Sequence, residues 1–366
     1  MPYQKHFIYK VYGTDGASLL ATYSTKRPSD GSGGYAKNGP SFDSQLNGFQ
    51  GELVIDLAVD FDDYPAVLDF MNVVKVYAVT VDDTPSQTVT LIYSGFVSRI
   101  EPYLNDAGEG VRVTCLGLGS LTTFAYYKNG AAYEVTHSAE DPSAIAEAIL
   151  DQVDTLHPGL LSYTPDSVQS VGTNVTVTFN DQKHADALKK THELSGTDWW
   201  WHVGADGVYQ LQQKPSSATH TFTIGLDVQS LTVTKDSEKV VNDVQVRGSG
   251  GNTDAFDATS ISTYGTRSKV VSDTSLGDAQ ARQQRGNKEV ADNKDSKAKT
   301  TLIINTNYEQ GIESIKVGQT ANVRNLRAGI VPDNALIASV RYDGDTVTVE
   351  LGEQTDFGRE LRKLIG

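Results

Sequence analysis

The sequence predicts a multi-domain protein that is mainly β, with an α+β block between two strand-rich regions. Its 366 residues suggest two or three domains at roughly 150 residues each. The composition, with 33 Gly, 17 Tyr and 11 Phe beside 11 Pro, is typical of turn-rich β structure. Segments with a period of two follow one another at short spacing and are separated by polar turns. This pattern favours a closed or sandwiched antiparallel sheet.

The composition also excludes several classes of protein. Charged residues make up 21% of the chain and hydrophobic residues 38%, which is too apolar for a disordered protein. The net charge of −15 argues against a protein that wraps nucleic acid, because neutralising phosphates takes clustered Lys and Arg. No apolar run approaches the roughly 18 residues of a membrane helix, and the N-terminus has no apolar signal core. Cys115 is the only cysteine, so an internal disulfide is excluded. We expect a soluble, reduced protein without a membrane segment.

Residues 1–125 are predicted to form a β-barrel-like domain. Alternation at 5–12 predicts the first strand, and a polar turn leads to the second at 17–23. The stretch 24–41 has no periodicity and is longer than an ordinary connection, so it is expected to be either mobile or a contact loop. Further strands are predicted at 53–59, 72–81, 88–102 and 110–119.

Residues 126–222 are predicted to form a middle α+β domain. Asp141 and Pro142 begin a helix as its N-cap and first helical residue, followed by an apolar stripe. A strand precedes a second helix, expected at 181–194 with Gly196 as its C-terminal cap. The segment DWWWHVGADGVYQLQ then predicts a hairpin around Asp206-Gly207.

Residues 223–366 return to strands and are predicted to form a second strand-rich domain. A helical insertion is expected near 275–294, where the apolar stripe is thin and includes Gly286, so this helix should be solvated or pack lightly. The last strands form a hairpin around the Asp343-Gly344 turn, and a short basic helix is expected at 357–366.

The chain contains no catalytic signature of the forms G-x-S-x-G, H-E-x-x-H or G-x-x-x-x-G-K-[ST]. Gly117, Gly119 and Ser120 resemble a phosphate loop, but a phosphate-binding Lys is missing, so a strand end at a barrel rim is favoured. Cys115 continues the alternation of its strand, which favours a buried core thiol over a nucleophile. Asn174 begins a glycosylation sequon that is expected to be accidental without a secretion signal.

Two groups of side chains are candidate metal ligands. Three histidines lie in or just after the second predicted helix: His184, His192 and His202. No Cys pair accompanies them, so zinc is the minor interpretation. The densest carboxylate cluster is formed by Asp60, Asp62 and Asp63. It does not match the D-x-[DN]-x-[DN]-G frame of a calcium loop, so a solvated strand end is favoured. The sequence therefore predicts no catalytic residue, no metal site and no cofactor.

Trp199, Trp200 and Trp201 are the most unusual local feature. On a strand, the outer two point to one face and the middle one to the other. The three tryptophans could form a sugar-stacking platform. Alternatively, both faces of the hairpin find apolar cover, against the helix at 181–194 on one side and a neighbouring domain on the other. The second interpretation is favoured, because no acidic pair accompanies the tryptophans as sugar hydrolysis would require.

Four segments, in this order, carry a resemblance to a known family: SFDSQLNGFQGELVIDLAVDFDDY at 41–64, GVRVTCLGLGSLTTF at 110–124, TFNDQKHADALKKTHELSGTDWWWHVGADGVYQLQ at 178–212 and IASVRYDGDTVTVELGE at 337–353. Together with the helix that begins at Asp141, their order and spacing resemble those of bacteriophage tail-hub proteins. These are the central baseplate or tail-tip proteins that close the tail tube. The resemblance spans nearly the whole chain.

The resemblance implies a structural virion protein of the tail tip or baseplate, made in the host cytoplasm. Each subunit would carry two related β-barrel-like tube domains flanking the middle α+β domain. A homotrimer would then form a pseudo-sixfold ring that matches the hexameric tail tube. The implied partners are the tail tube or distal tail protein, tip, spike or fibre proteins, and genomic DNA that passes without specific binding. Many relatives carry a C-terminal hydrolase or fibre domain. This chain ends shortly after its last hairpin, so we expect no enzymatic role.

Two other functions stay open at this point. A tail-tip receptor or glycan-binding protein would use exposed aromatic side chains such as Trp200. A cell-envelope-degrading tail enzyme would need paired acids or a metal in a cleft. For the tail-hub function, a ring of acidic chains suggests an acidic lumen, which would repel DNA phosphates and let the genome pass.

Overall fold

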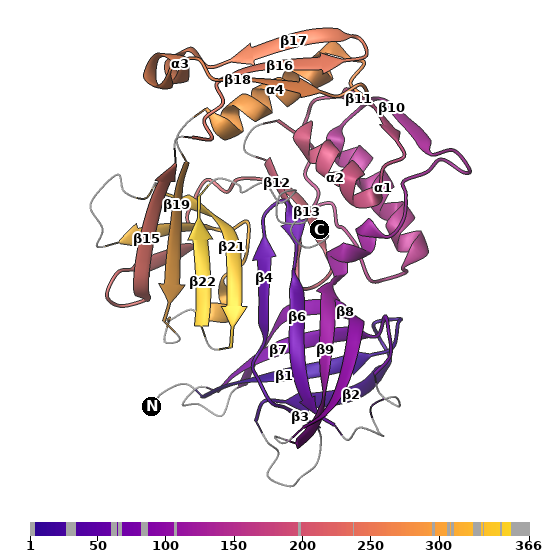
Figure 1. Ribbon diagram of the computed structural model, residues 1–366, viewed down its shortest axis with the longest axis vertical. Helices are drawn as coiled ribbons and strands as arrows, with labels where there is room; N and C mark the ends of the chain where they lie inside the picture. Colours follow the sequence, from indigo (N-terminus) through magenta and orange to yellow (C-terminus); the bar gives the residue numbers. More distant parts are fainter. Residues whose placement is uncertain are drawn as a thin grey trace.

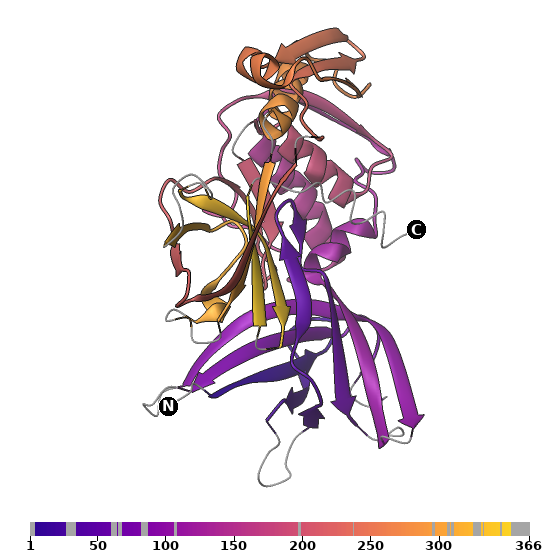
Figure 2. The ribbon, with the colours of Figure 1, turned by 60° about the vertical axis from the view of Figure 1, so that its left-hand side comes forward.

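The computed structural model describes residues 4–26, 34–59, 64, 68–81, 87–105, 108–196, 199–236, 238–294, 297–305, 308, 311–324, 331, 333–344 and 346–352. A strand barrel lies at one end of the molecule and a small lobe at the other, with a second sheet and an α+β block between them (Figure 1 and Figure 2). The predicted class, mainly β with an α+β insertion, is confirmed.

The N-terminal region forms a closed barrel. Its strands are β1 (Gln4–Tyr12), β2 (Leu19–Ser24), β3 (Gly34–Ala36), β6 (Glu52–Ala58), β7 (Val73–Val81), β8 (Gln87–Asn105) and β9 (Gly108–Gly117). They pair in the order β1-β2-β3-β6-β9-β8-β7, and β7 closes the barrel by pairing with β1. The predicted alternation of the first strand is confirmed, because Phe7, Tyr9 and Val11 are buried. Cys115 on β9 is also buried, as predicted, and burial raises the pKa of its thiol.

The segment between β2 and β6 differs from its prediction. The stretch 24–41 is not wholly aperiodic, because β3 lies within it and joins β2 to β6 in the barrel. Residues 27–33 of this stretch lie outside the described ranges. Two further short strands, β4 (Ser41–Gln45) and β5 (Gly48–Phe49), leave the barrel and pair with strands of other sheets. Such short strands carry too few residues for periodicity to reveal them.

The middle block packs two helices against short strands. It contains β10 (Glu134–Glu140), α1 (Pro142–Leu156), β11 (Val175–Asn180), α2 (His184–Glu193), β12 (Trp199–Val203) and β13 (Tyr209–Gln213). Asp141 is the predicted N-cap, since its side chain accepts a hydrogen bond from the backbone N–H of Ser143 at 2.9 Å. The second helix begins later than predicted, because Asp181 has a φ of 49°, outside the helical region. The predicted hairpin is confirmed as β12–β13.

The C-terminal strands form an open, curved sheet that we call the half-barrel. Its strands are β14 (His220–Thr223), β15 (Val228–Asp236), β19 (Lys297–Ile304), β20 (Thr320–Arg324), β21 (Ala335–Asp343) and β22 (Thr346–Leu351). They pair in the order β14-β20-β21-β22-β19-β15, and β4 from the N-terminal region pairs along β21. The predicted final hairpin is confirmed as β21–β22.

A lobe is inserted between β15 and β19, which lead up to it (Figure 1 and Figure 2). It contains β16 (Asp243–Gly248), β17 (Gly251–Phe256), α3 (Ala258–Tyr264), β18 (Ser268–Ser272) and α4 (Ala279–Asn293). The helix predicted near 275–294 is confirmed as α4, but the expectation that it packs lightly is wrong. Gly286 lets α4 approach the sheet, since a Cβ there would lie 3.0 Å from Ala255 and 3.3 Å from Val246. Ala281 and Val290 on the same helix are buried.

Two predictions fall outside the described residues, the Asp60, Asp62 and Asp63 cluster and the helix at 357–366. The domain boundaries at 125/126 and 222/223 stay predictions. Each helix within the described ranges is too short or too polar to span a lipid bilayer.

Candidate functional site

The three sheets meet around residues 41–50, which we call the junction segment. Within it, β4 extends the half-barrel by pairing with β21, and β5 pairs in parallel with β12 of the middle block. Between these strands, the backbone N–H of Asn47 donates to the carbonyl oxygen of Trp201 at 2.7 Å. The side-chain Oδ1 of Asn47 accepts a hydrogen bond from the backbone N–H of Trp201 at 3.2 Å. The chain then returns to the barrel as β6. One short segment therefore fastens the barrel, the half-barrel and the middle block together.

Aromatic packing joins the barrel to the half-barrel across this segment. The ring of Phe42 on β4 lies 4.9 Å from that of Tyr93 on β8 and 4.9 Å from that of Tyr342 on β21, measured between centroids. These residues belong to one hydrophobic core that continues from the barrel into the half-barrel. Lys5 and Glu313 add a largely buried ion pair of 2.7 Å between the two units. A shared core makes independent motion of the two units costly.

The three tryptophans face two different cores, as the favoured interpretation predicts. Trp199 and Trp201 belong to the core of the middle block, where Trp201 stacks on Tyr209 with ring centroids 5.7 Å apart. Trp200 points the other way, into the core shared by the barrel and the half-barrel. It is only 2% exposed. Trp200 is therefore not the exposed aromatic side chain that a sugar-stacking platform requires.

Two buried histidines anchor β12 at its two ends. His202 donates from Nδ1 to the carbonyl oxygen of Gln45 at 3.0 Å and accepts at Nε2 from the hydroxyl of Ser44 at 3.1 Å. His192 donates from Nε2 to the carbonyl oxygen of Trp199 at 2.8 Å, since a carbonyl only accepts. Burial lowers the pKa of His202 to about 4 and holds the pKa of His192 well below its ordinary value. Both side chains are neutral cross-links in this arrangement.

The candidate metal ligands do not assemble. The ring of His184 lies next to that of Tyr127, with centroids 6.0 Å apart, while His192 and His202 bind separate carbonyl groups. Burial lowers the pKa of His184 as well. Within the part of the chain that the structure describes, no three His, Cys, Asp or Glu side chains gather into a group that could hold a metal ion.

The glycine-rich run after β9 has a packing role. β9 ends at Gly117, and Ser120 lies in a 3-10 helix, Leu118–Thr123 (η2), at the barrel rim. A Cβ at Gly117 would lie 2.2 Å from the carbonyl oxygen of Gln50, and one at Gly119 would lie 2.3 Å from the Cβ of Phe49. The glycines thus make room for the end of the junction segment. Asn174, the start of the sequon, is exposed just before β11.

A groove of about 550 Å³ opens beside the junction segment. The rings of Phe42, Trp200 and Tyr342 line it, together with neutral polar side chains that include those of Ser44, Gln50, His202, Gln210 and Gln319. Two acids, Asp206 and Glu313, are found among the described lining residues. Glu313 accepts hydrogen bonds from Lys5 at 2.7 Å and Thr80 at 2.8 Å. These bonds make Glu313 a structural group, and sugar hydrolysis uses a pair of carboxyls across one bond.

No family model matches the sequence, and no curated protein matches it. Solved structures do match. The 43 kDa tail protein of prophage MuSo2 from Shewanella oneidensis aligns with a TM-score of 0.57 and 11% identity, over 95% of this chain and 97% of its own. The tail protein from Neisseria meningitidis MC58 aligns with a TM-score of 0.61 and 11% identity, over 86% of this chain and 91% of its own. The chain has a phage tail-protein fold.

A third structure with this fold is the prophage tail protein gp18 from Listeria monocytogenes EGD-e, with a TM-score of 0.56, 8% identity and coverage of 99% of this chain and 98% of its own. At such identities the likeness concerns the fold alone. Because the alignments cover nearly all of each chain, the tail-protein fold includes the barrel, the half-barrel, the middle block and the lobe. The resemblance expected from the order of the segments is confirmed at this level.

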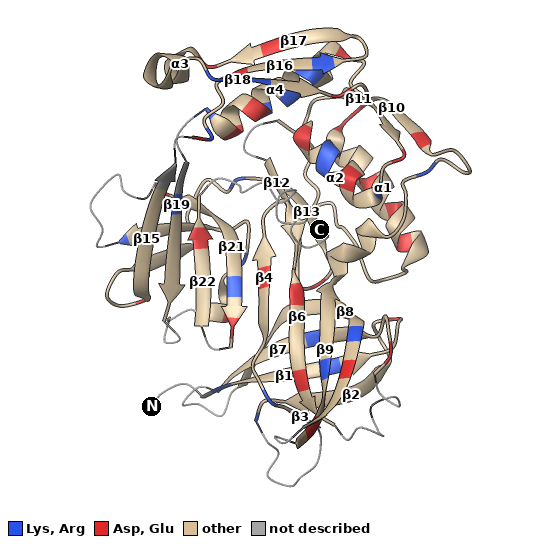
Figure 3. Cartoon of the chain, in the orientation of Figure 1, with Lys and Arg blue, Asp and Glu red and all other residues tan. Residues whose placement is uncertain are grey.

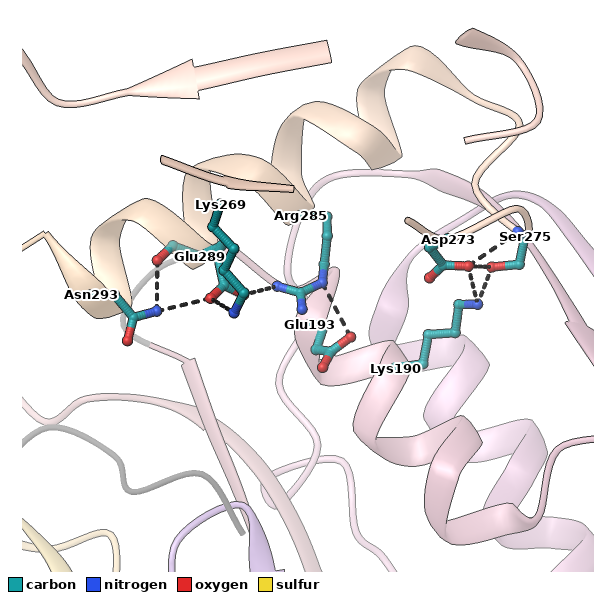
Figure 4. Close-up of polar contacts among 8 residues, drawn as sticks. All are labelled: Lys190, Glu193, Lys269, Asp273, Ser275, Arg285, Glu289 and Asn293. Atoms are coloured by element: carbon teal, nitrogen blue, oxygen red, sulfur yellow. Dashed lines mark hydrogen bonds and ion pairs between the residues drawn. The ribbon is translucent and has the colours of Figure 1, made fainter. Parts of the chain in front are cut away.

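A charged cluster joins the lobe of the tail-protein fold to α2 (Figure 4). Its members are Lys190, Glu193, Lys269, Asp273, Ser275, Arg285, Glu289 and Asn293. Arg285 on α4 pairs with Glu193 on α2 at 3.3 Å and with Glu289 at 2.8 Å. Burial opposes ionisation of Glu289, but Arg285 and Lys269 hold its pKa below the ordinary value. Lys190 on α2 pairs with Asp273 at 3.1 Å. These ion pairs therefore add to the buried hydrophobic cluster that the lobe shares with the middle block.

Among the described residues, the half-barrel of the tail-protein fold has two open edges. Across the described ranges, β15 pairs on one side with β19, and β14 pairs on one side with β20. An open edge exposes backbone groups to pairing with another chain. Sequence analysis missed these edges and the junction segment, because both depend on which distant strands pair. The only local signals were the apolar residues Phe42, Leu46 and Phe49 in an otherwise polar stretch.

Proposed function

We propose that this chain is a structural virion protein of a phage tail tip or baseplate. In this proposal it forms a homotrimer that closes or extends the tail tube and provides part of the channel for DNA ejection. The proposal is supported by the tail-protein fold and by one observation: the described strands of the half-barrel leave two edges open, and this sheet shares a core with a closed barrel. Soluble proteins cover or blunt long open edges, and assembly with other subunits is one way to cover them.

The pairing of two strand-rich units in one subunit suits an adaptor between a sixfold tube and a threefold tip. Each subunit brings two strand-rich units, the barrel and the half-barrel, held in one body by the junction segment and a shared core. Three subunits in a closed ring then present six such units, which fits a sixfold tube on one side and a threefold tip on the other. The neighbours in this proposal are the tail tube or distal tail protein and the tip, spike or fibre proteins.

We propose no enzymatic role and no receptor-binding role for Trp200. The catalytic alternative needs a pair of free carboxyls in a cleft, and Glu313 in the groove is already bound by Lys5 and Thr80. The glycan-binding alternative needs an exposed ring, and Trp200 is buried. The described residues therefore favour a structural role.

The proposal is tested by measuring assembly and edge protection together. Sedimentation over a range of concentrations should show trimers, and hydrogen exchange should show that backbone amides of β14 and β15 become protected only in the trimer. The amides of β22, which is paired on both sides, serve as the internal control and should be protected in both states. A chain that stays monomeric at every concentration contradicts the proposal.

A further inference from the structure

The first half of strand β8 has an open edge, although the barrel it belongs to is closed. β7 pairs with β8 over Gln87–Phe96, whereas β9 pairs with it only over Gly95–Asn105. Within the described ranges, the backbone of Val89–Leu91 has no hydrogen-bond partner other than β7. The sequence of this edge, QTVTLI, contains neither the Lys nor the Pro that commonly blunts an exposed strand edge. The edge is therefore available for pairing with another strand.

This open edge forms one wall of the groove beside the junction segment. Four consecutive residues of β8, Val89–Ile92, line the groove. Successive side chains of a strand point to opposite faces, so a groove that all four residues line runs along the backbone edge of the strand. The side-chain amide of Gln50 pairs with the end of this edge. It donates to the carbonyl oxygen of Ile92 at 2.7 Å and accepts from the backbone N–H of Ser94 at 3.1 Å.

The wall formed by the β12–β13 hairpin is uncharged and carries an unpaired donor. Register places Trp200 opposite Gln212 and His202 opposite Gln210, and all four line the groove. The strands of the hairpin carry no Lys, Arg, Asp or Glu side chain (Figure 3). Nε1 of Trp200 is a buried donor without a hydrogen-bond partner among the described residues. An unpaired buried donor costs about 1–3 kcal/mol, so a ligand that supplies a carbonyl oxygen is favoured.

These features together select the class of ligand. A sugar could bind to amide side chains, but it does not pair with a strand edge. The row of N–H and C=O groups along such an edge is matched by the backbone of an extended peptide. The charged residues among the described lining are Asp206, Glu313 and Lys316. Glu313 is already paired with Lys5, so the remaining charges balance and an uncharged peptide fits best.

We infer that the groove receives an extended, uncharged peptide arm of a neighbouring tail protein, which adds a strand to the open edge of β8. The source of the arm rests on the proposed function, whereas the docking of a strand rests on the edge itself. Alternate side chains of the arm face the rings of Phe42 and Tyr342, which are partners in the β4–β21 pair and line the same groove. The arm also covers Val89, an apolar side chain that is 56% exposed in the chain alone.

Tethering a peptide to the groove tests the inference. Cys115 is buried, so Lys316→Cys places a single reactive thiol at the exposed rim of the groove. The probe is the end-blocked peptide Cys-Gly-Gly-Thr-Val-Thr-Val-Thr, joined to the full-length chain through a disulfide. The same peptide with N-methyl groups on its Thr and Val amides keeps the side chains but cannot donate backbone hydrogen bonds. Thr263→Cys, on an exposed position of α3 in the lobe, is the matched control.

Hydrogen exchange of residues 87–92 is the readout. In the free chain, amides of this stretch that point away from β7 should exchange rapidly. The tether holds the peptide at a millimolar effective concentration, so pairing with a Kd of about 0.1 mM slows their exchange about tenfold. The N-methylated peptide at position 316, and either peptide on Thr263→Cys, should leave the exchange unchanged. Equal exchange with the two peptides at position 316 overturns the inference.

Exchange of the chain without any peptide separates the other outcomes. Protection of residues 87–92 only in trimers means that a second copy covers the edge, and protection in monomers means that the chain covers it itself. Either result overturns the partner arm and leaves the proposed trimer, which sedimentation measures, intact. A chain that pairs with the tethered peptide but never assembles removes the proposed function and keeps the peptide groove.

Discussion

The indole ring of Trp200 lies directly over the backbone of Gly318. A Cβ added to Gly318 would stand 2.3 Å from Cη2 of Trp200, and the residue has a φ of 85°, which side chains with L chirality rarely adopt. Trp200 comes from β12 of the middle block, and Gly318 lies just before β20 of the half-barrel. This contact is one of the points where the two units fit together.

Gly318→Ala should therefore lower the free energy of unfolding by about 2–4 kcal/mol, from overpacking against the ring and from the strained backbone. Urea denaturation followed by tryptophan fluorescence measures the loss. Gly344→Ala is the matched control, because Gly344 has a φ of 59° but a Cβ added there would meet no described atom within 4 Å. It should cost only the backbone strain, about 1 kcal/mol. Equal losses in the two variants would show that the Trp200 contact is unimportant.

Lowering the pH should reduce the free energy of unfolding, because His202 fastens β12 to the junction segment as a neutral side chain. Burial lowers the pKa of His202 from 6.5 to about 4. Between these values the unfolded chain binds the proton more readily than the folded one, so stability falls as the pH drops from 6.5 towards 4. From pH 7 to pH 5 this group accounts for about 2 kcal/mol. His184 and His192 shift in the same direction and add to the loss.

His202→Gln should reduce this pH dependence by the share of His202, while the share of His184 and His192 remains. Ser44→Ala is the control, since it removes one hydrogen bond but keeps the imidazole, and its pH dependence should remain. Denaturation at pH 7 and pH 5 compares the three proteins. A His202→Gln protein with the pH dependence of the unmodified chain would contradict the assignment.

Removing Arg285 should loosen the lobe. Arg285→Ala leaves Glu193 without Arg285 and leaves Glu289 with Lys269 as its remaining cation, which should cost about 1–3 kcal/mol. Hydrogen exchange should rise in α2 and α4 and stay unchanged in the barrel. Arg112→Ala breaks the exposed Arg112–Asp56 pair on the barrel and should change stability little. Unchanged exchange in α2 and α4 would show that the ions do not hold the lobe.

A chain from which the lobe is deleted should still fold. Asp236 on β15 and Lys297 on β19 are partners in an antiparallel pair, so an Asn-Gly turn can join them into a plain hairpin. We expect the shortened chain to keep its barrel and half-barrel, with increased exchange in α2, where Lys190 and Glu193 lose their partners. Hydrogen exchange of β1 to β9 provides the measurement. A shortened chain that unfolds would mean that the lobe is part of the folding unit.

Sequence patterns predicted those elements whose information is local. The N-cap at Asp141, the alternation of β1 and the turn at Asp343-Gly344 each depend on a few neighbouring residues, and all are confirmed. The two-faced burial of Trp199 and Trp200 also followed from strand geometry. These features required no knowledge of the distant parts of the chain.

Pairing between distant segments could not be predicted in this way. β4 and β5 are short, and only their partners, β21 and β12, make them strands. In the lobe, β18 pairs in parallel with β16 and is mostly exposed, so it lacks the apolar alternation that reveals a strand. The charged cluster around Arg285 brings together α2 and α4. The spacing of charged residues along the sequence does not predict that contact.

The pairing of β4 with β21 also sets an order of events during synthesis. Residues 41–45 are synthesised about 300 residues before the β21 residues that pair with them. The barrel strands can pair early and bring Tyr93 to one side of Phe42, whereas Tyr342 can cover the other side only after the last part of the chain is made. Contacts so far apart in sequence form slowly, and until they do the nascent protein carries an unprotected strand edge that invites aggregation.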